Sequence, residues 1–143
     1  MKKVIGIFSL IVIFGCALAS AAEFQIQDAL FVPVAYVNDQ GKILDANHVL
    51  LGRIDKDGIV YDVTNKNLGF VGSDLTVRDV HHKVLAAVDQ GGAITDVGGG
   101  AAGFISSAKV TDGAGKVVAR YEGPVDKRQV LAYLFFFSKS FER

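Results

Sequence analysis

A step of 17 residues recurs along most of the chain and constrains its fold more than any other feature. One column of aspartates keeps steps of 17, 17, 17 and 16 residues: Asp45, Asp62, Asp79, Asp96 and Asp112. Three further columns keep the same phase, and they read Ile43, Val60, Val77, Ile94, Val110; Gly52, Gly69, Ala86, Gly103, Ala119; and Ile54, Val71, Val88, Ile105, Tyr121. This internal period predicts about five tandem copies of one small unit.

Each unit holds two short β-prone segments separated by turn residues, as in Leu51–Ile54, Asp55–Gly58 and Ile59–Asp62. Asp-Gly between apolar segments is typical of a tight β-hairpin turn. A single hairpin is only marginally stable in water, so neighbouring copies must share one core. The sequence therefore predicts an all-β domain of hairpin repeats closed into a five-fold ring. A short open β-solenoid is the alternative.

The aspartate and glycine columns have structural explanations. Each aspartate stands where the second segment of a unit ends, and its carboxylate can accept a backbone N–H two residues further on. Glycine inside a strand costs about 0.5 to 1 kcal/mol relative to alanine, so the positions Gly52, Gly69 and Gly103 need a compensating gain. We expect close approach of neighbouring backbones around a narrow axis to supply it.

The repeat columns resemble those of a known family of small exported bacterial proteins, the five-fold β-flower proteins. The resemblance is carried by the Leu-Gly-x-Ile/Val and Val-x-Asp patterns, the step near 17, and the closing run Phe135-Phe136-Phe137, and it covers roughly residues 34–137. It implies a ring of β-hairpins around an approximate five-fold axis and carries no activity to transfer. The third copy departs from the pattern with Ala86 for glycine, and the fourth has Ala102 for leucine and lacks one residue.

The N-terminal residues have the pattern of a secretory signal. Lys2 and Lys3 precede an apolar stretch from Val4 to Leu18, and Ala19-Ser20-Ala21 supplies small residues for cleavage before Ala22. We therefore expect a signal at residues 1–21, a hairpin-repeat domain at 22–124, and an apolar C-terminal helix and tail at 125–143. The expected location is periplasmic or secreted.

A second processing route ends at Cys16, because Ile13-Phe14-Gly15-Cys16 resembles a bacterial lipobox. Lipidation there would anchor the chain to a membrane, whereas cleavage before Ala22 leaves a chain without cysteine, and so without a disulfide or a thiolate nucleophile. Removal of Lys2 and Lys3 leaves 13 basic against 15 acidic residues, a net charge of −2. Without a basic tract, nucleic-acid binding is not expected.

Both ends of the repeat array carry a further predicted element. Phe24 and Ile26 alternate with glutamines as in a half-buried strand, whose partner the sequence does not indicate. After Gly123-Pro124, Asp126 with Gln129 three residues later is typical of a helix N-cap and predicts a helix from about residue 127 to 137.

The C-terminal phenylalanines cannot all lie on one face of that helix. Val130, Leu134, Phe137 and Phe141 share a stripe, while Phe135 and Phe136 point away from it. One interpretation is a helix plugged into the end of the ring and surrounded by side chains. The other is a contact of Phe135 and Phe136 with a second subunit, an envelope protein or a lipid surface.

No residue cluster reaches the pattern of a catalytic, metal or cofactor site. His48 and His82 share a repeat register two copies apart, and with His81 they offer no third ligand at a recognisable spacing. The remaining motifs are incomplete: Asp55–Gly58 lacks the later acid of a calcium loop, Gly98–Gly100 lacks the lysine of a phosphate loop, and Ser73, Ser106 and Ser107 lack a paired histidine and acid.

We therefore expect a non-enzymatic exported scaffold or interaction module of the cell envelope, without a cofactor, whose partner is an envelope protein or a second copy bound through the C-terminal phenylalanines. The alternative is an enzyme or small-ligand binder that uses the repeat loops. A pocket at one end of the ring would favour that alternative if it held several of these residues: Asp55, Asp57, Arg78, His81 and Arg120.

Overall fold

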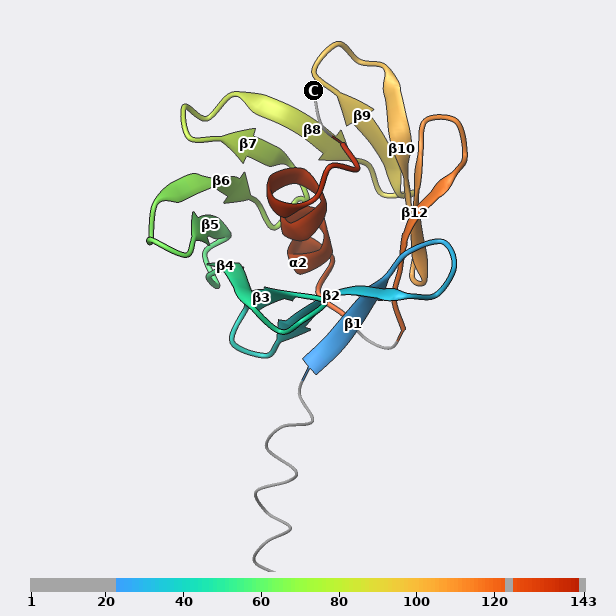
Figure 1. The fold of residues 1–143 in the computed structure, drawn as a ribbon. Helices are drawn as coiled ribbons and strands as arrows, with labels where there is room; N and C mark the ends of the chain where they lie inside the picture. Colours follow the sequence, from blue (N-terminus) through green and yellow to red (C-terminus); the bar gives the residue numbers. More distant parts are fainter. Residues whose placement is uncertain (1–22, 123–124, 142–143) are drawn as a thin grey trace, which may run out of the picture.

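The computed structural model describes residues 23–122 and 125–141, and these form a ring of strands around a central helix (Figure 1). The expected signal, Cys16 and the cleavage site lie outside the described residues. The strands are β1 (Glu23–Gln27), β2 (Pro33–Asn38), β3 (Lys42–Asp45), β4 (Leu50–Ile54), β5 (Ile59–Asp62), β6 (Asn67–Val71), β7 (Val77–Asp79), β8 (Val84–Val88), β9 (Ala93–Asp96), β10 (Ala101–Ile105), β11 (Lys109–Asp112) and β12 (Val117–Arg120). The helix comprises α2 (Lys127–Ala132), continued by a π-helical turn, η1 (Tyr133–Phe137).

The strands form one closed antiparallel barrel. Each strand pairs with its neighbours in sequence, and β1 pairs with β12 through Gln27 and Arg120. That last pairing closes the ring, so the alternative of an open β-solenoid is wrong. A closed barrel leaves no unpaired sheet edge at which another chain could add a strand.

The twelve strands within the described residues make six strand pairs, one more than the five copies counted in the sequence. The additional copy is the hairpin of β1 and β2, with Asp28 one 17-residue step before Asp45. Ile26 and Ala35 likewise stand 17 residues before Ile43 and Gly52. The predicted strand around Phe24 and Ile26 therefore has two partners, β2 and β12.

The missing residue of the array lies in the turn between β10 and β11. There the N–H of Ser106 donates to the carbonyl of Lys109, three residues on. In the equivalent turn of the preceding copy, the N–H of Asp89 donates to the carbonyl of Ala93, four residues on. A turn one residue shorter accounts for the 16-residue step and leaves the strands in register.

The barrel core is one belt of small apolar side chains. The Ile/Val column of the odd-numbered strands is fully buried at all six positions. Its members pair directly with the Gly/Ala column of the even-numbered strands, as in Ile43 with Gly52 and Val110 with Ala119. The third column lies on the other side of the same row, as in Ile54 with Val60. Large and small residues thus alternate around the ring.

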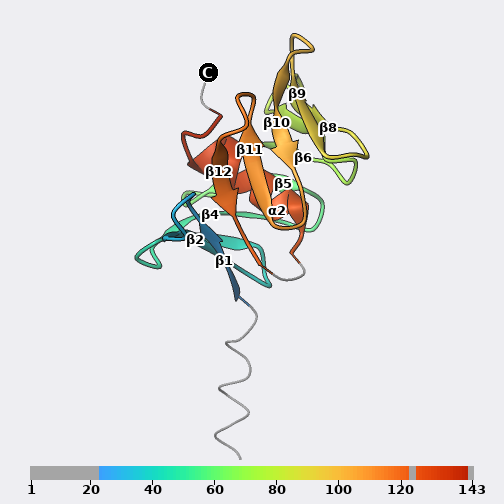
Figure 2. The same ribbon diagram turned by 90° about the vertical axis from the view of Figure 1, so that its right-hand side faces the viewer.

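The C-terminal helix fills the middle of the barrel (Figures 1 and 2). Five consecutive residues, Val130 to Leu134, are buried, which on a helix requires neighbours in every direction. This arrangement agrees with a helix plugged into the ring. Burial of an aliphatic side chain such as Leu131 or Leu134 stabilises the fold by about 1.5–3 kcal/mol, so the helix is a structural part of the barrel.

Candidate functional site

All six turns that follow the odd-numbered strands lie at the same end of the barrel, because successive antiparallel strands alternate in direction. We call this end the Asp-turn end. In each turn, the aspartate carboxylate accepts the backbone N–H groups of the second and fourth residues after it, at 2.8–3.0 Å. The aspartates are Asp28, Asp45, Asp62, Asp79, Asp96 and Asp112. Each carboxylate is thereby used by its own turn.

These hydrogen bonds favour the ionised carboxylate. The side chain of Thr64, followed by the N–H of Lys66, lowers the pKa of Asp62, and the N–H of Lys83 lowers the pKa of Asp79. Both carboxylates are exposed to solvent, and they stay ionised because the turn donates to them. The aspartate column therefore shapes the backbone.

The third residue after each aspartate has a positive φ. The six are Phe31, His48, Asn65, His82, Gly99 and Gly115, with φ between 63° and 85°. Glycine and asparagine tolerate this conformation, whereas a bulky side chain is strained in it. The shared register of His48 and His82 thus reflects the turn geometry. His48 stacks on Tyr36 with 4.0 Å between ring centroids, and its Nε2 lies 3.4 Å from a carboxylate oxygen of Glu23.

The described residues contain no group of three histidine, cysteine, aspartate or glutamate side chains that could hold a metal ion. His81 and His82 stand on the turn between β7 and β8, and the β5–β6 hairpin separates them from the turn that carries His48. The structure therefore does not bring the three histidines together.

The glycine column allows the central phenylalanines to lie against the strands. A Cβ atom added at Gly52 would lie 2.5 Å from Phe137, and one added at Gly69 would lie 2.5 Å from Phe136. At Gly103 an added Cβ would meet the carbonyl oxygen of Thr111 at 2.1 Å. Close backbone approach thus accounts for all three glycines, but at Gly52 and Gly69 the aromatic rings of the helix approach as well as the next strand.

The C-terminal phenylalanines are half-buried. Phe135 stacks on Phe141 with 4.8 Å between centroids, and both line a hollow of about 250 Å³ beside Ala86 and Ala102. Phe136 packs against the core and over Gly69. Neither Phe135 nor Phe136 is a freely exposed side chain.

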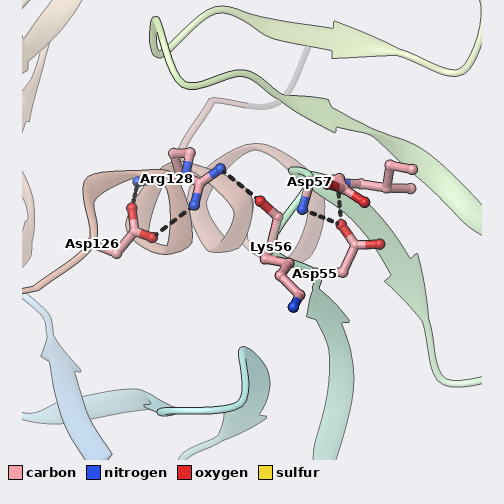
Figure 3. Close-up of polar contacts among 6 residues, drawn as sticks. Asp55, Lys56, Asp57, Asp126 and Arg128 are labelled. Atoms are coloured by element: carbon pink, nitrogen blue, oxygen red, sulfur yellow. Dashed lines mark hydrogen bonds and ion pairs between the residues drawn. The ribbon is translucent and has the colours of Figure 1, made fainter.

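The opposite end of the barrel carries a small polar cavity of about 200 Å³ at the start of the helix. Asp126 caps the helix by accepting the N–H of Arg128 at 2.9 Å. The Arg128 guanidinium lies 3.3 Å from the Asp126 carboxylate and donates to the carbonyl of Lys56, also at 3.3 Å (Figure 3). This contact ties the helix to the β4–β5 turn, in which Asp55 accepts the N–H of Asp57.

The residues proposed for a ligand pocket do not converge. Asp55 is the one member of that set on the wall of this cavity. At the other end, Arg78 donates to the carbonyl of His82 at 3.4 Å, and the Arg120 guanidinium lies 4.3 Å from the ring centroid of Phe31.

The exposed apolar side chains gather at the Asp-turn end. Of the nine large apolar side chains that are exposed within residues 23–122 and 125–141, eight lie in these turns or directly beside them: Leu30, Phe31, Val32, Val49, Leu50, Val63, Val80 and Val97. Sequence reasoning missed this surface. Its signal was the recurrence of valine directly after Asp62, Asp79 and Asp96, together with the apolar run from Ala29 to Pro33.

None of the helical segments in the described part of the chain has the length and apolar character needed to cross a membrane. A search of curated proteins and a search of solved structures each found no match. A comparison with protein-family models matches residues 20–138, most of the chain, to the 5-fold beta-flower proteins. The closed ring of repeated hairpins agrees with that match, and the chain belongs to the 5-fold beta-flower protein family.

Proposed function

We propose that this protein is a non-enzymatic exported interaction module of the cell envelope, and that it meets its partner with the Asp-turn end of the barrel. One observation carries the proposal, the gathering of eight exposed apolar side chains at that end. A monomeric protein rarely leaves such side chains together in water unless they form a contact surface. The C-terminal phenylalanines support the surface from below, because they pack beneath the same end.

The filled interior also favours a surface function. The helix occupies the lumen, and no polar or charged side chain is buried among the residues that the structure describes. Catalytic groups usually owe their altered pKa values to burial beside a charged partner. Here the groups whose pKa is lowered are exposed turn aspartates, and burial raises the pKa of Tyr121 and Tyr133.

The alternative of a small-ligand binder would use the cavity beside Arg128. Its polar groups already serve the helix cap and the link to Lys56. Few groups are then left to orient a ligand, and this makes the surface function the stronger proposal.

We infer that the ring of this chain is built from six similar units with a step near 17 residues, in place of five. Six aspartate turns with the same two hydrogen bonds support this number, although the family takes its name from a five-fold ring.

Export is the second half of the proposal, with cleavage before Ala22 and lipidation of Cys16 as the two routes. Glu23 pairs with Asn38 at the end of the barrel opposite the Asp turns. A lipid on Cys16 would therefore tether the opposite end and leave the Asp-turn end facing away from that membrane. Mass spectrometry of the N-terminus of the exported protein decides between the two routes.

The contact surface is tested by changing its valines. In the triple variant Val63→Thr, Val80→Thr, Val97→Thr we expect loss of a partner that the wild-type protein retains from envelope extract, or loss of self-association in sedimentation velocity. Phe104→Thr on β10 is the matched control, because Phe104 is the one exposed large apolar residue of the described set outside the Asp turns. Phe136→Ser is unsuitable, since Phe136 packs over Gly69. Retention of the same partner by the triple variant would contradict the proposal.

A further inference from the structure

The turn between β1 and β2 differs from the five turns equivalent to it. Its tip exposes three consecutive large apolar side chains: Leu30 at 81%, Phe31 at 62% and Val32 at 52%. The positions equivalent to Leu30 and Phe31 hold polar or small residues in every other copy: Asn47-His48, Thr64-Asn65, His81-His82, Gly98-Gly99 and Ala114-Gly115. One turn of six therefore carries an apolar tip.

Phe31 occupies a backbone conformation that suits it poorly. Its φ is 67°, in the left-handed region that glycine and asparagine prefer. A bulky aromatic residue that is both strained and largely exposed does not serve the stability of its turn, and such strain is typical of functional positions. The two observations together point to a ligand for this tip.

Basic side chains surround the tip. The Arg120 guanidinium lies 4.3 Å from the Phe31 ring centroid and donates to the carbonyl of Ala29 at 3.4 Å. Lys116 and Lys139 line an open hollow of about 660 Å³ next to Leu30, together with Val117 and Val118.

Two carboxylates border the same hollow, but both are engaged. Asp28 accepts the N–H groups of Leu30 and Val32, and Asp112 accepts those of Ala114 and Lys116. The groups left to meet a ligand are thus apolar at the tip and cationic around it.

We propose that the β1–β2 turn docks this protein onto an anionic lipid surface. Leu30 and Phe31 enter the boundary between headgroups and acyl chains, while Arg120, Lys116 and Lys139 meet the lipid phosphates. Apolar insertion combined with flanking cations is the common chemistry of peripheral membrane binding. The inference rests on the proposed function, since it names the partner of the exposed apolar end.

A second copy of the chain fits this surface less well. A two-fold contact through the β1–β2 turn would place the same patch of each molecule against itself. Arg120, Lys116 and Lys139 would then face their own counterparts, and juxtaposed like charges weaken an interface. An anionic lipid surface instead supplies the opposite charge.

The experiment measures co-sedimentation with vesicles of phosphatidylcholine alone and of phosphatidylcholine with about one third phosphatidylglycerol. All proteins carry Cys16→Ser, so that no lipid is attached, and are purified after export on their own signal. We expect the unmodified surface to bind the anionic vesicles and to bind the neutral ones more weakly. Lys116→Gln and Lys139→Gln should each weaken anionic binding about fivefold.

The decisive variant is the pair Leu30→Thr, Phe31→Asn, which copies Thr64-Asn65 of the β5–β6 turn. We expect its vesicle affinity to fall at least about tenfold, with no loss in melting temperature because asparagine accepts the left-handed backbone. Phe104→Thr is the control and should bind like the starting protein.

The lipid inference is overturned if the starting protein does not bind anionic vesicles, or if the Leu30→Thr, Phe31→Asn pair binds them undiminished. If vesicles are not bound while an envelope protein is retained through the valines of the Asp-turn end, the lipid inference fails and the proposed function stands.

Discussion

Alanine at Gly52 tests whether the glycine column exists to admit the central helix. The added Cβ would lie 2.2 Å from the carbonyl oxygen of Tyr61 on the next strand and 2.5 Å from Phe137. A carbon this close to backbone must move away by about 1 Å, because real Cβ contacts essentially never fall below 3.0 Å. The substitution therefore pushes against a paired strand and an aromatic ring at the same time.

The expected cost follows from overpacking of a filled core, which destabilises proteins by about 1–3 kcal/mol. Gly52→Ala should lie near the upper end, about 3 kcal/mol, because both neighbours must shift. For a domain of this size that corresponds to a melting temperature lower by about 10 °C. Gly103→Ala meets the next strand alone, at the Thr111 carbonyl, and should cost less.

The assay is thermal unfolding followed by circular dichroism, with urea titration for the free energy. Phe137→Leu combined with Gly52→Ala should recover about 1 kcal/mol relative to the sum of the single effects, because contacting residues couple. The same Phe137→Leu change combined with Gly103→Ala is the control and should be additive. Unfolding of Gly52→Ala within about 2 °C of wild type, or additivity in both pairs, would refute the reasoning.

Three further predictions concern the turns and the buried tyrosine. Asp62 and Asp79 have lowered pKa values in the folded state, so their contribution to stability is present above their ordinary pKa of 3.8 and is lost as the pH falls below it; urea unfolding should show a smaller acid dependence in Asp62→Asn than in wild type. Asp96→Ala removes the acceptor of two backbone N–H groups and should cost about 1 kcal/mol, whereas Asp96→Asn should cost less, and equal unfolding free energies for the two would contradict the assigned turn role. Burial raises the pKa of Tyr121 to about 12, so ultraviolet titration should find one tyrosine that ionises late, and its contribution to stability should be lost as the pH rises above 10; Tyr121→Phe should abolish this late step together with the hydrogen bond to the Ser106 carbonyl.

Local features of the barrel could be predicted from the chain because they depend on residues close in sequence. An aspartate that bonds to N–H groups two and four residues away forms its turn wherever the unit is placed. The same holds for the helix start at Asp126, which accepts the N–H of Arg128. The 16-residue step at Asp112 likewise reflected a shorter turn at Ser106.

The candidate surface was harder to predict, because the exposure of a side chain depends on what packs against it. The run of phenylalanines from Phe135 to Phe137 appeared to be the natural contact, yet the barrel covers much of these rings. The turn tip at Leu30 and Phe31 appeared to be part of an apolar strand, yet nothing in the described fold covers it.

The sequence by itself determined the repeat unit, its turn chemistry and its alternation of large and small core residues, since all of these recur at a constant step. Tertiary structure decided how many units close the ring and what fills it. Closure depends on Gln27 of the first strand meeting Arg120 of the last, and the lumen is filled by a helix from the chain's other end. Contacts between segments this far apart leave no periodic trace, because they are set by the size and shape of the assembled ring.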